Sequence, residues 1–214
     1  MRWLFRLVGL CFALLSFAAS PVRAAEPADL LLILAADVSR SVTSDKFKLQ
    51  REGYAAAVAD PRVLEAIASG RNHRIAVLFM EWANAGDQKV VIDWTMIDGP
   101  KTAQAFGDQL LEEPRSMLGR TSISGGIDFA VTQFARAPFL SERQTIDVSG
   151  DGTNNAGRDV SKARDDALRL GIAINGLVIL SETPMPWNPE HTLIRPAGSP
   201  PIIARTSPAG RAAS

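Results

Sequence analysis

The residues that decide the fold are Leu30-Leu31-Leu32-Ile33-Leu34-Ala35-Ala36-Asp37-Val38-Ser39-Arg40-Ser41. The apolar part has the length of one strand and no polar position, which predicts a strand buried on both faces in a parallel sheet. Ligands of open α/β sheets bind at the carboxyl edge, where this strand would end. Asp37, Ser39 and Ser41 offer only oxygen atoms there, and this favours a hard divalent cation. The alternative is a polar turn, with Ser41 or Ser44 capping the next helix.

The first two dozen residues have the pattern of a secretory signal peptide. Arg2 and Arg6 flank a short apolar run, and small residues around Ala24 provide a cleavage site. The run is too short for a membrane span. We therefore expect residues 1–24 to be removed, leaving a periplasmic or secreted bacterial protein with no stable membrane span. The single cysteine, Cys11, lies in this segment, so the mature chain would have no disulfide and no thiolate metal site.

The rest of the chain is nearly balanced in charge. Removal of residues 1–24 takes away three arginines and no acid, so 20 basic and 23 acidic residues remain, a net charge of −3. This balance argues against a nucleic-acid partner, which would need a strongly basic surface. About 190 residues remain after cleavage, enough for one domain with a substantial core. We expect that domain over residues 25–182.

Strand and helix patterns alternate along this domain. After the opening strand, further strands are predicted at residues 74–83, 89–97, 144–149 and 172–180, and helices at 44–60, 61–69, 100–113, 122–136 and 159–170. The short polar connection between the strands at 74–83 and 89–97 makes them an antiparallel hairpin. The other strands suit a parallel sheet with helical crossovers on both faces. The sequence therefore predicts a three-layer, doubly wound α/β fold.

Two more polar loops follow elements of this sheet. Thr121 precedes the helix start Ser124-Gly125-Gly126, and Asp151 lies in the loop 150–155 after a strand. Taken separately, Thr121 would be a helix cap and Asp151 a turn former. Neighbouring parallel strands bring such loops to one edge, so we expect five oxygen-bearing side chains to surround one ion, namely Asp37, Ser39, Ser41, Thr121 and Asp151.

This combination of residues resembles the metal-ion-dependent adhesion site (MIDAS) of the von Willebrand factor A (vWA) domain family. The D-x-S-x-S motif, the later threonine and the aspartate of a D-G turn are all present, and the resemblance extends from Leu30 to about Leu180. More narrowly, the chain is similar to the secreted bacterial members of unassigned function, of the DUF1194 type. Those members carry a V-S-G-D-G-x-N-N segment, present here from Val148 to Asn155.

The resemblance implies a role for each of the five residues. Ser39, Ser41 and Thr121 would bind the ion directly or nearly so, and Asp37 and Asp151 directly or through water. The implied ion is Mg²⁺, with Mn²⁺ or Ca²⁺ as alternatives, and one coordination position is left for an acidic side chain of a partner protein. Only two of the five side chains carry charge, so they at most balance the charge of a divalent ion, and its open position can still attract another anion. The implied function is adhesion or protein interaction, not catalysis.

The resemblance also implies the strand order 3-2-1-4-5-6, with the third strand antiparallel at one edge. The sequence shows neither a sixth strand nor a closing helix after the strand at 172–180. Residues 183–214 instead contain seven prolines, and no acid follows Glu190. We therefore expect a Pro-rich tail that is disordered, or that comes from truncation or a frame shift, and an exposed sheet edge.

One alternative function is an enzyme. The loop 150–155 also resembles the G-D-G-x-N-D loop of haloacid-dehalogenase-type phosphatases, which use Mg²⁺ and an aspartate at the end of the first strand. Those enzymes need a second carboxylate two residues after the nucleophile as general acid. Ser39 occupies that position, and its hydroxyl cannot take the role.

Three further side chains are interpreted as structural. Glu81 ends a predicted strand and is expected to be an ordinary exposed acid, with support of the ion's ligands as the alternative. Trp82 and Trp94 are expected to pack in the core or across the hairpin.

Overall fold

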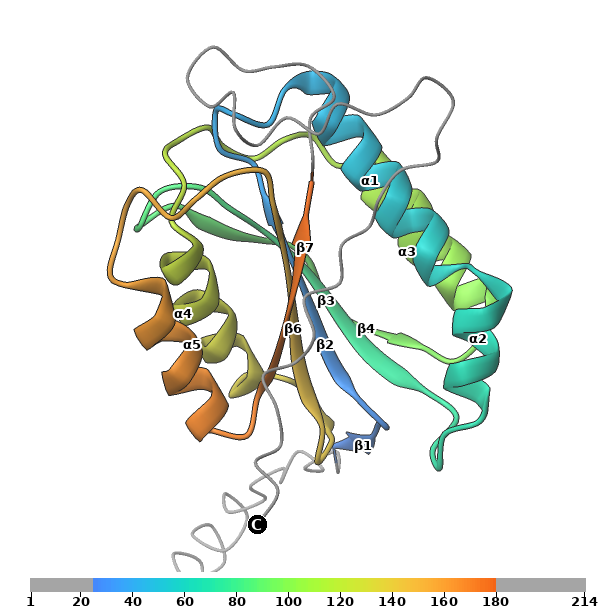
Figure 1. The fold of residues 1–214 in the computed structure, drawn as a ribbon. Helices are drawn as coiled ribbons and strands as arrows, with labels where there is room; N and C mark the ends of the chain where they lie inside the picture. The colour runs from blue at the N-terminus through green and yellow to red at the C-terminus, as the bar shows by residue number, and fades with distance from the viewer. Residues whose placement is uncertain (1–24, 180–214) are drawn as a thin grey trace, which may run out of the picture.

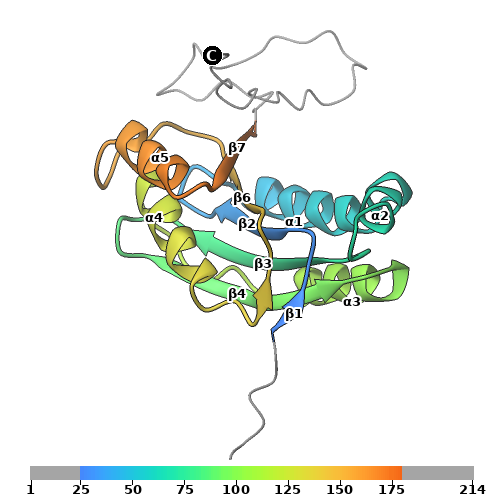
Figure 2. The same cartoon turned by 90° about the horizontal axis from the view of Figure 1, so that it is seen from below.

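Seven residues, Leu31–Asp37, form the central strand β2 of a computed structural model that describes residues 25–179. Strand β2 pairs in parallel with β3 (Ile75–Trp82) on one side and with β6 (Gln144–Gly150) on the other. Nearly all of its side chains are buried, because helices cover both faces of the sheet (Figures 1 and 2). This double burial explains why the strand is apolar at every position before Asp37.

The five-stranded sheet has the order β4-β3-β2-β6-β7. Strand β4 (Gln88–Ile97) is antiparallel to β3, and β7 (Ala173–Val178) is parallel to β6. The predicted fold class is therefore confirmed, including the hairpin and the antiparallel edge strand. The predicted signal peptide, the tail at 183–214 and the expected lack of a sixth strand and closing helix lie outside the described residues.

Two layers of helices enclose the sheet (Figure 1). One layer contains α1 (Ser44–Val58), α2 (Pro61–Ala68) and α3 (Pro100–Glu112). The other contains α4 (Ile123–Phe134) and α5 (Val160–Arg169). None of the helices within residues 25–179 has both the length and the apolar character needed to cross a bilayer.

The two cores lie on opposite faces of the sheet, and alternate residues of each strand enter different cores. Ile33 and Ala35 of β2 pack with the α4 and α5 layer, whereas Leu34 and Ala36 pack with the α1 and α3 layer. Trp82 and Trp94 both belong to the α4 and α5 core, which confirms that they are packing residues. The alternation also decides which way each residue at a strand end points.

Two local details differ from the predictions. Strands β1 (Glu26–Pro27) and β5 (Phe139–Leu140) form a separate parallel pair that was not predicted, because two residues are too short for a periodic pattern. Thr43, rather than Ser44, caps α1: its Oγ1 accepts a hydrogen bond from the Lys46 N–H at 3.3 Å. The cap leaves Ser41 free for a contact elsewhere.

Candidate metal centre

The first polar loop begins where β2 ends, and Asp37 sets its turn. The Ser39 N–H donates to Asp37 Oδ1 at 2.7 Å, a local bond of the type that Asp forms with the backbone two residues on. The Val38 N–H donates to the Trp82 carbonyl at 2.9 Å, which ties the loop to the end of β3. As a result, the side chains of Asp37 and Ser39 are buried at the carboxyl edge of the sheet.

Thr121 reaches the same place from the loop between α3 and α4. Its N–H donates to Asn155 Oδ1 at 2.9 Å, and its carbonyl accepts from the Asn155 N–H at 2.8 Å, which ties this loop to the one after β6. The Thr121 hydroxyl donates to Ser39 Oγ at 3.2 Å. Ser122 caps α4 instead, accepting from the Gly125 N–H at 3.1 Å. The threonine hydroxyl is therefore not used as a cap.

Asp151 joins the first loop from the end of β6. Ser41 Oγ donates to Asp151 Oδ1 at 2.6 Å and lies 3.1 Å from Ser39 Oγ. Gly150 makes room for this approach, because a Cβ atom there would lie 3.1 Å from Asp37 Oδ2. The structure thus brings all five predicted side chains together. Hydrogen bonds run from Thr121 through Ser39 and Ser41 to Asp151, and the Ser39 backbone connects Asp37.

The sequence patterns missed a sixth group at this centre, the ammonium of Lys46. Lys46 Nζ lies 2.6 Å from Asp151 Oδ2, and the two side chains are 12% and 0% exposed. Lys46 is the third residue of α1, where the positive end of the helix dipole disfavours a cation. That unfavourable position is the one sequence signal that pointed to a nearby anion.

The sequence patterns also missed Arg115, which lies in the segment after α3 and contacts the first loop. Its Nη2 donates to the carbonyls of Val38 and Ser39, at 2.7 Å in each case. The guanidinium carbon lies 5.6 Å from the centroid of the Phe47 ring, so α1 is part of the same contact. Because these bonds go to backbone carbonyls, Arg115 positions the loop and does not itself pair with the Asp37 carboxylate.

One carboxylate oxygen of Asp37 is buried without a partner. Among residues 25–179, none donates a hydrogen bond of normal geometry to Asp37 Oδ2, although the side chain is fully buried. Burial raises the pKa of Asp37 to about 6; hydrogen bonds from Ser39 and from the Asp151 backbone oppose this shift, and the negative charge of Asp151 adds to it. A buried, ionised and unpaired carboxylate is costly, so a cation beside it would stabilise the fold.

The residues present fit a hard divalent cation. The available donors are three hydroxyls and two carboxylates, and oxygen atoms are the preferred ligands of Mg²⁺, Mn²⁺ and Ca²⁺. Nowhere in residues 25–179 do three or more His, Cys, Asp or Glu side chains gather as a metal cluster. The anionic ligands at this edge are therefore the two aspartates, and a divalent ion there would retain attraction for a further anion.

The prediction for Glu81 is wrong, because its side chain is fully buried. Arg51 Nη2 donates to Glu81 Oε1 at 2.5 Å. The Ser116 N–H donates to Oε2 at 2.7 Å, and the Ser116 hydroxyl donates to the same oxygen. Glu81 is two residues after Phe79 in β3 and therefore lies on the same face of the sheet, towards α1 and α3. Asp37 is two residues after Ala35 in β2 and lies on the opposite face. Glu81 therefore belongs to a structural ion pair.

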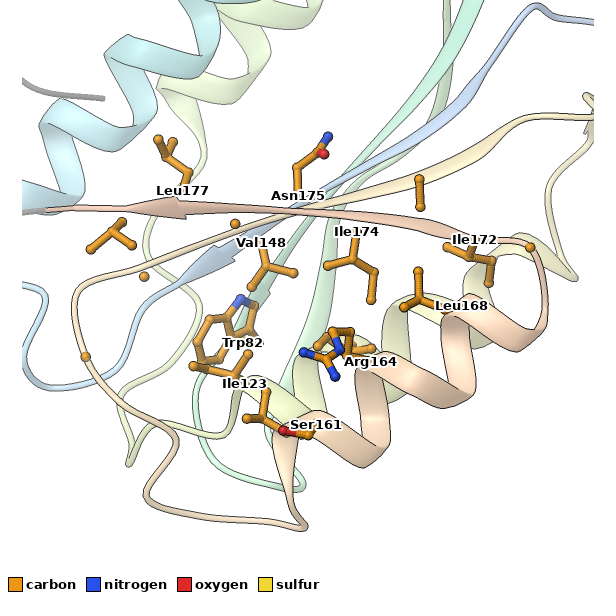
Figure 3. Close-up of a pocket in the computed structure, with 18 residues that line it drawn as sticks. Trp82, Ile123, Val148, Ser161, Arg164, Leu168, Ile172, Ile174, Asn175 and Leu177 are labelled. Carbon is orange, nitrogen blue, oxygen red and sulfur yellow. The ribbon is translucent and has the colours of Figure 1, made fainter. Parts of the chain in front are cut away.

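A cavity of about 620 Å³ lies next to this edge, between β7 and the helices α4 and α5 (Figure 3). Trp82, Ile123 and Ile174 are among its mostly apolar lining residues, and the loop that carries Asp151 borders it through Gly150 and Gly152. Among the described residues that line the cavity there is no carboxylate, so they do not offer a second cation site.

Comparisons with known proteins identify the family and the fold of this chain. The family model described as "Protein of unknown function (DUF1194)" matches residues 27–194, more than half of the chain. The chain belongs to the DUF1194 family. None of the curated proteins matches its sequence.

Solved structures show the fold that this DUF1194 chain shares. Proximal thread matrix protein 1 from the mussel byssus, in a form with a zinc-occupied MIDAS motif, has a TM-score of 0.54 and 15% identity, covering 73% of this chain and 39% of that chain. The pilus adhesin SpaC from Lactobacillus rhamnosus GG has a TM-score of 0.50 and 12% identity, covering 72% of this chain and 24% of that chain. These likenesses show a vWA-type fold. The DUF1194 chain spans less than half the length of either protein.

Proposed function

We propose that this DUF1194 protein is a secreted or periplasmic interaction module that binds a partner protein through a divalent cation. The cation is Mg²⁺, with Mn²⁺ or Ca²⁺ as alternatives, and its ligands are Asp37, Ser39, Ser41, Thr121 and Asp151. The observation that carries the proposal is the buried Oδ2 of Asp37, which has no hydrogen-bond partner in the described part of the chain and lies beside a connected set of hydroxyls. A cation would provide the missing partner.

The charge of the centre supports an acidic partner. Asp37 and Asp151 are the carboxylates available, so they neutralise at most the two positive charges of the ion, and Ser39, Ser41 and Thr121 add none. An aspartate that binds through water screens the ion less than a direct ligand does, so the ion would keep an attraction for a further anion. A carboxylate from another protein is then the natural remaining ligand, because it supplies both charge and oxygen.

The structural neighbours are consistent with this role. One of them holds zinc at a MIDAS motif and another is named as a pilus adhesin, and neither is named as an enzyme. The position two residues after Asp37, where a phosphatase of the haloacid-dehalogenase type needs its general acid, is occupied by Ser39. We therefore propose binding, rather than hydrolysis, as the function.

Calorimetric titration of Mg²⁺ and Mn²⁺ into the mature chain tests the ligand assignment. We expect saturable binding that Asp151→Asn and Ser39→Ala each weaken by at least about tenfold, because each removes a ligand from a small oxygen-only site. Asp165→Asn is the matched control: Asp165 is an exposed acid of α5 that pairs with Arg164. Equal affinity in the wild type and the Asp151→Asn/Ser39→Ala double variant would refute the assignment.

Affinity capture from an extract of the cell envelope tests the partner. The wild-type protein with Mg²⁺ should retain a protein that is released by a chelator and is not retained by Ser39→Ala. Partner retention that survives both the chelator and the variant would show that the interaction does not pass through the ion.

A further inference from the structure

Lys46 and Asp151 form an ion pair at the centre of the proposed ion site. The ammonium lies 2.6 Å from Asp151 Oδ2, and the Ser41 hydroxyl lies 2.6 Å from Oδ1, so both oxygens of this carboxylate have a partner. The Asp151 side chain is fully buried, and Lys46 is 12% exposed. Asp37, by contrast, has one carboxylate oxygen that no residue within 25–179 contacts through a hydrogen bond. The two aspartates of the centre therefore differ: Asp151 is paired with the Lys46 ammonium, and Asp37 is not paired with it.

The position of Lys46 shows that this pair is held against an opposing force. A cation in the first turn of α1 meets the positive end of the helix dipole, so the ammonium is stabilised there by Asp151 and not by its helix. Lys48, two residues on, points to solvent and lies 3.8 Å from Glu52 on the same helix. Of these two lysines, only Lys46 reaches into the centre.

A divalent ion and the ammonium cannot both use Asp151 without strong repulsion. Ligation by Asp151, either directly or through a water beside Ser41, would place a charge of about +2 within a few ångströms of Lys46 Nζ, where burial limits solvent screening. With the ammonium in place, the two aspartates and the lysine carry a net charge of about −1; with it removed, they carry about −2. The ammonium therefore lowers the attraction of the centre for a divalent ion.

We propose that Lys46 is a resident cation that the divalent ion must displace, so that this side chain sets the ion concentration at which the centre fills. This inference rests on the proposed function, because it assumes that Asp151 binds the ion. It assigns regulation to a residue outside the ligand set. When the ion binds, the ammonium leaves Asp151 and becomes more exposed.

The first test compares Mn²⁺ affinity in wild type, Lys46→Met and Lys48→Met by calorimetry. Lys46→Met should bind about tenfold more tightly than wild type, because a charge-assisted hydrogen bond no longer has to be broken. Lys48→Met removes the same charge from an exposed position and should differ from wild type by less than about twofold. Equal or weaker binding by Lys46→Met overturns the displacement, whereas absence of binding in all three proteins overturns the proposed function itself.

The second test follows the lysine directly. Brief acetylation of the wild-type protein, followed by peptide mass spectrometry, reports the reactivity of each amine with and without saturating Mg²⁺. We expect Lys46 to become several-fold more reactive when the ion is bound, with Lys48 unchanged as the internal control. Unchanged reactivity of Lys46 under conditions where calorimetry shows binding would overturn the proposal, even if Lys46→Met binds more tightly, because simple electrostatics would then suffice.

Discussion

Two buried carboxylates at the ends of neighbouring strands differ in whether their oxygens have hydrogen-bond partners. Glu81 lies one residue before the end of β3, and Asp37 is the last residue of β2; both are fully buried. Each Glu81 oxygen has a partner, from Arg51 or Ser116. Asp37 has one oxygen bonded to the Ser39 backbone and one with no partner among the described residues.

The difference indicates that the charge of Glu81 stabilises the fold, whereas the charge of Asp37 is available for a ligand. Glu81 is neutralised inside the protein, so it needs nothing from solvent. Asp37 forms no ion pair with a residue in the range 25–179, and burial raises the pKa of its carboxyl to about 6. An unsatisfied buried acid next to hydroxyl oxygens is a better indication of a cation site than the number of carboxylates is.

The largest effect is expected from breaking the internal pair. Arg51→Met leaves Glu81 buried without its counter-ion, so we expect the free energy of unfolding to fall by about 3–5 kcal/mol. Urea denaturation with and without Mg²⁺ would measure this loss, which should be the same in both conditions because neither residue is a proposed ligand of the ion. The double variant Arg51→Met/Glu81→Met should recover most of the stability. A loss below about 1 kcal/mol, the range of an exposed pair, would contradict the structural role.

A smaller effect of opposite sign is expected at Asp37. Its pKa is 3.8 ordinarily and about 6 in the folded, metal-free protein, so the folded state binds the proton more strongly, and stability falls as the pH rises between these values. In chelator at pH 7.5, Asp37→Asn removes that ionised group, and we expect the free energy of unfolding to rise by roughly 1–3 kcal/mol.

The gain should shrink towards pH 4, where wild-type Asp37 is protonated in the folded protein. The same variant should lose ion binding, which Asp165→Asn should keep. If Asp37→Asn were less stable than wild type in chelator at pH 7.5, the buried oxygen would have to have a partner after all.

The smallest expected effect is the response of ion affinity to pH. Ion and proton compete for Asp37, so affinity for Mn²⁺ should be nearly constant above about pH 7 and should fall below the pKa of about 6. When the pH is lowered from 7.5 to 5.0, we expect the dissociation constant measured by calorimetry to become about tenfold larger. An affinity that stays constant down to pH 5 would place the ion away from Asp37.

Local patterns predicted most of the fold. The apolar run before Asp37 became β2, and the short polar link before Gln88 became the hairpin of β3 and β4. Both features depend on burial and turn chemistry within a few residues. The two-residue strands β1 and β5 were missed because each exists only through its pairing with the other.

The candidate site was predicted in part. The D-x-S-x-S loop, Thr121 and Asp151 were recognised because their residue types and their places after strands are visible in the chain. That these side chains hydrogen-bond to one another is a finding of the structure, and that they bind an ion stays a proposal. No comparable pattern pointed to Arg115, whose guanidinium donates to two backbone carbonyls of the loop.

The sequence by itself determined the sheet, its helical layers and the family, because hydrophobic period and turn residues are properties of short stretches. Only the tertiary structure decided which buried charges have partners. Arg51 reaches Glu81 across 30 residues and Lys46 reaches Asp151 across 105, and no local pattern identifies the partner in either contact. The physical reason is that the cost of a buried charge depends on the groups that packing places around it, and those groups come from distant parts of the chain.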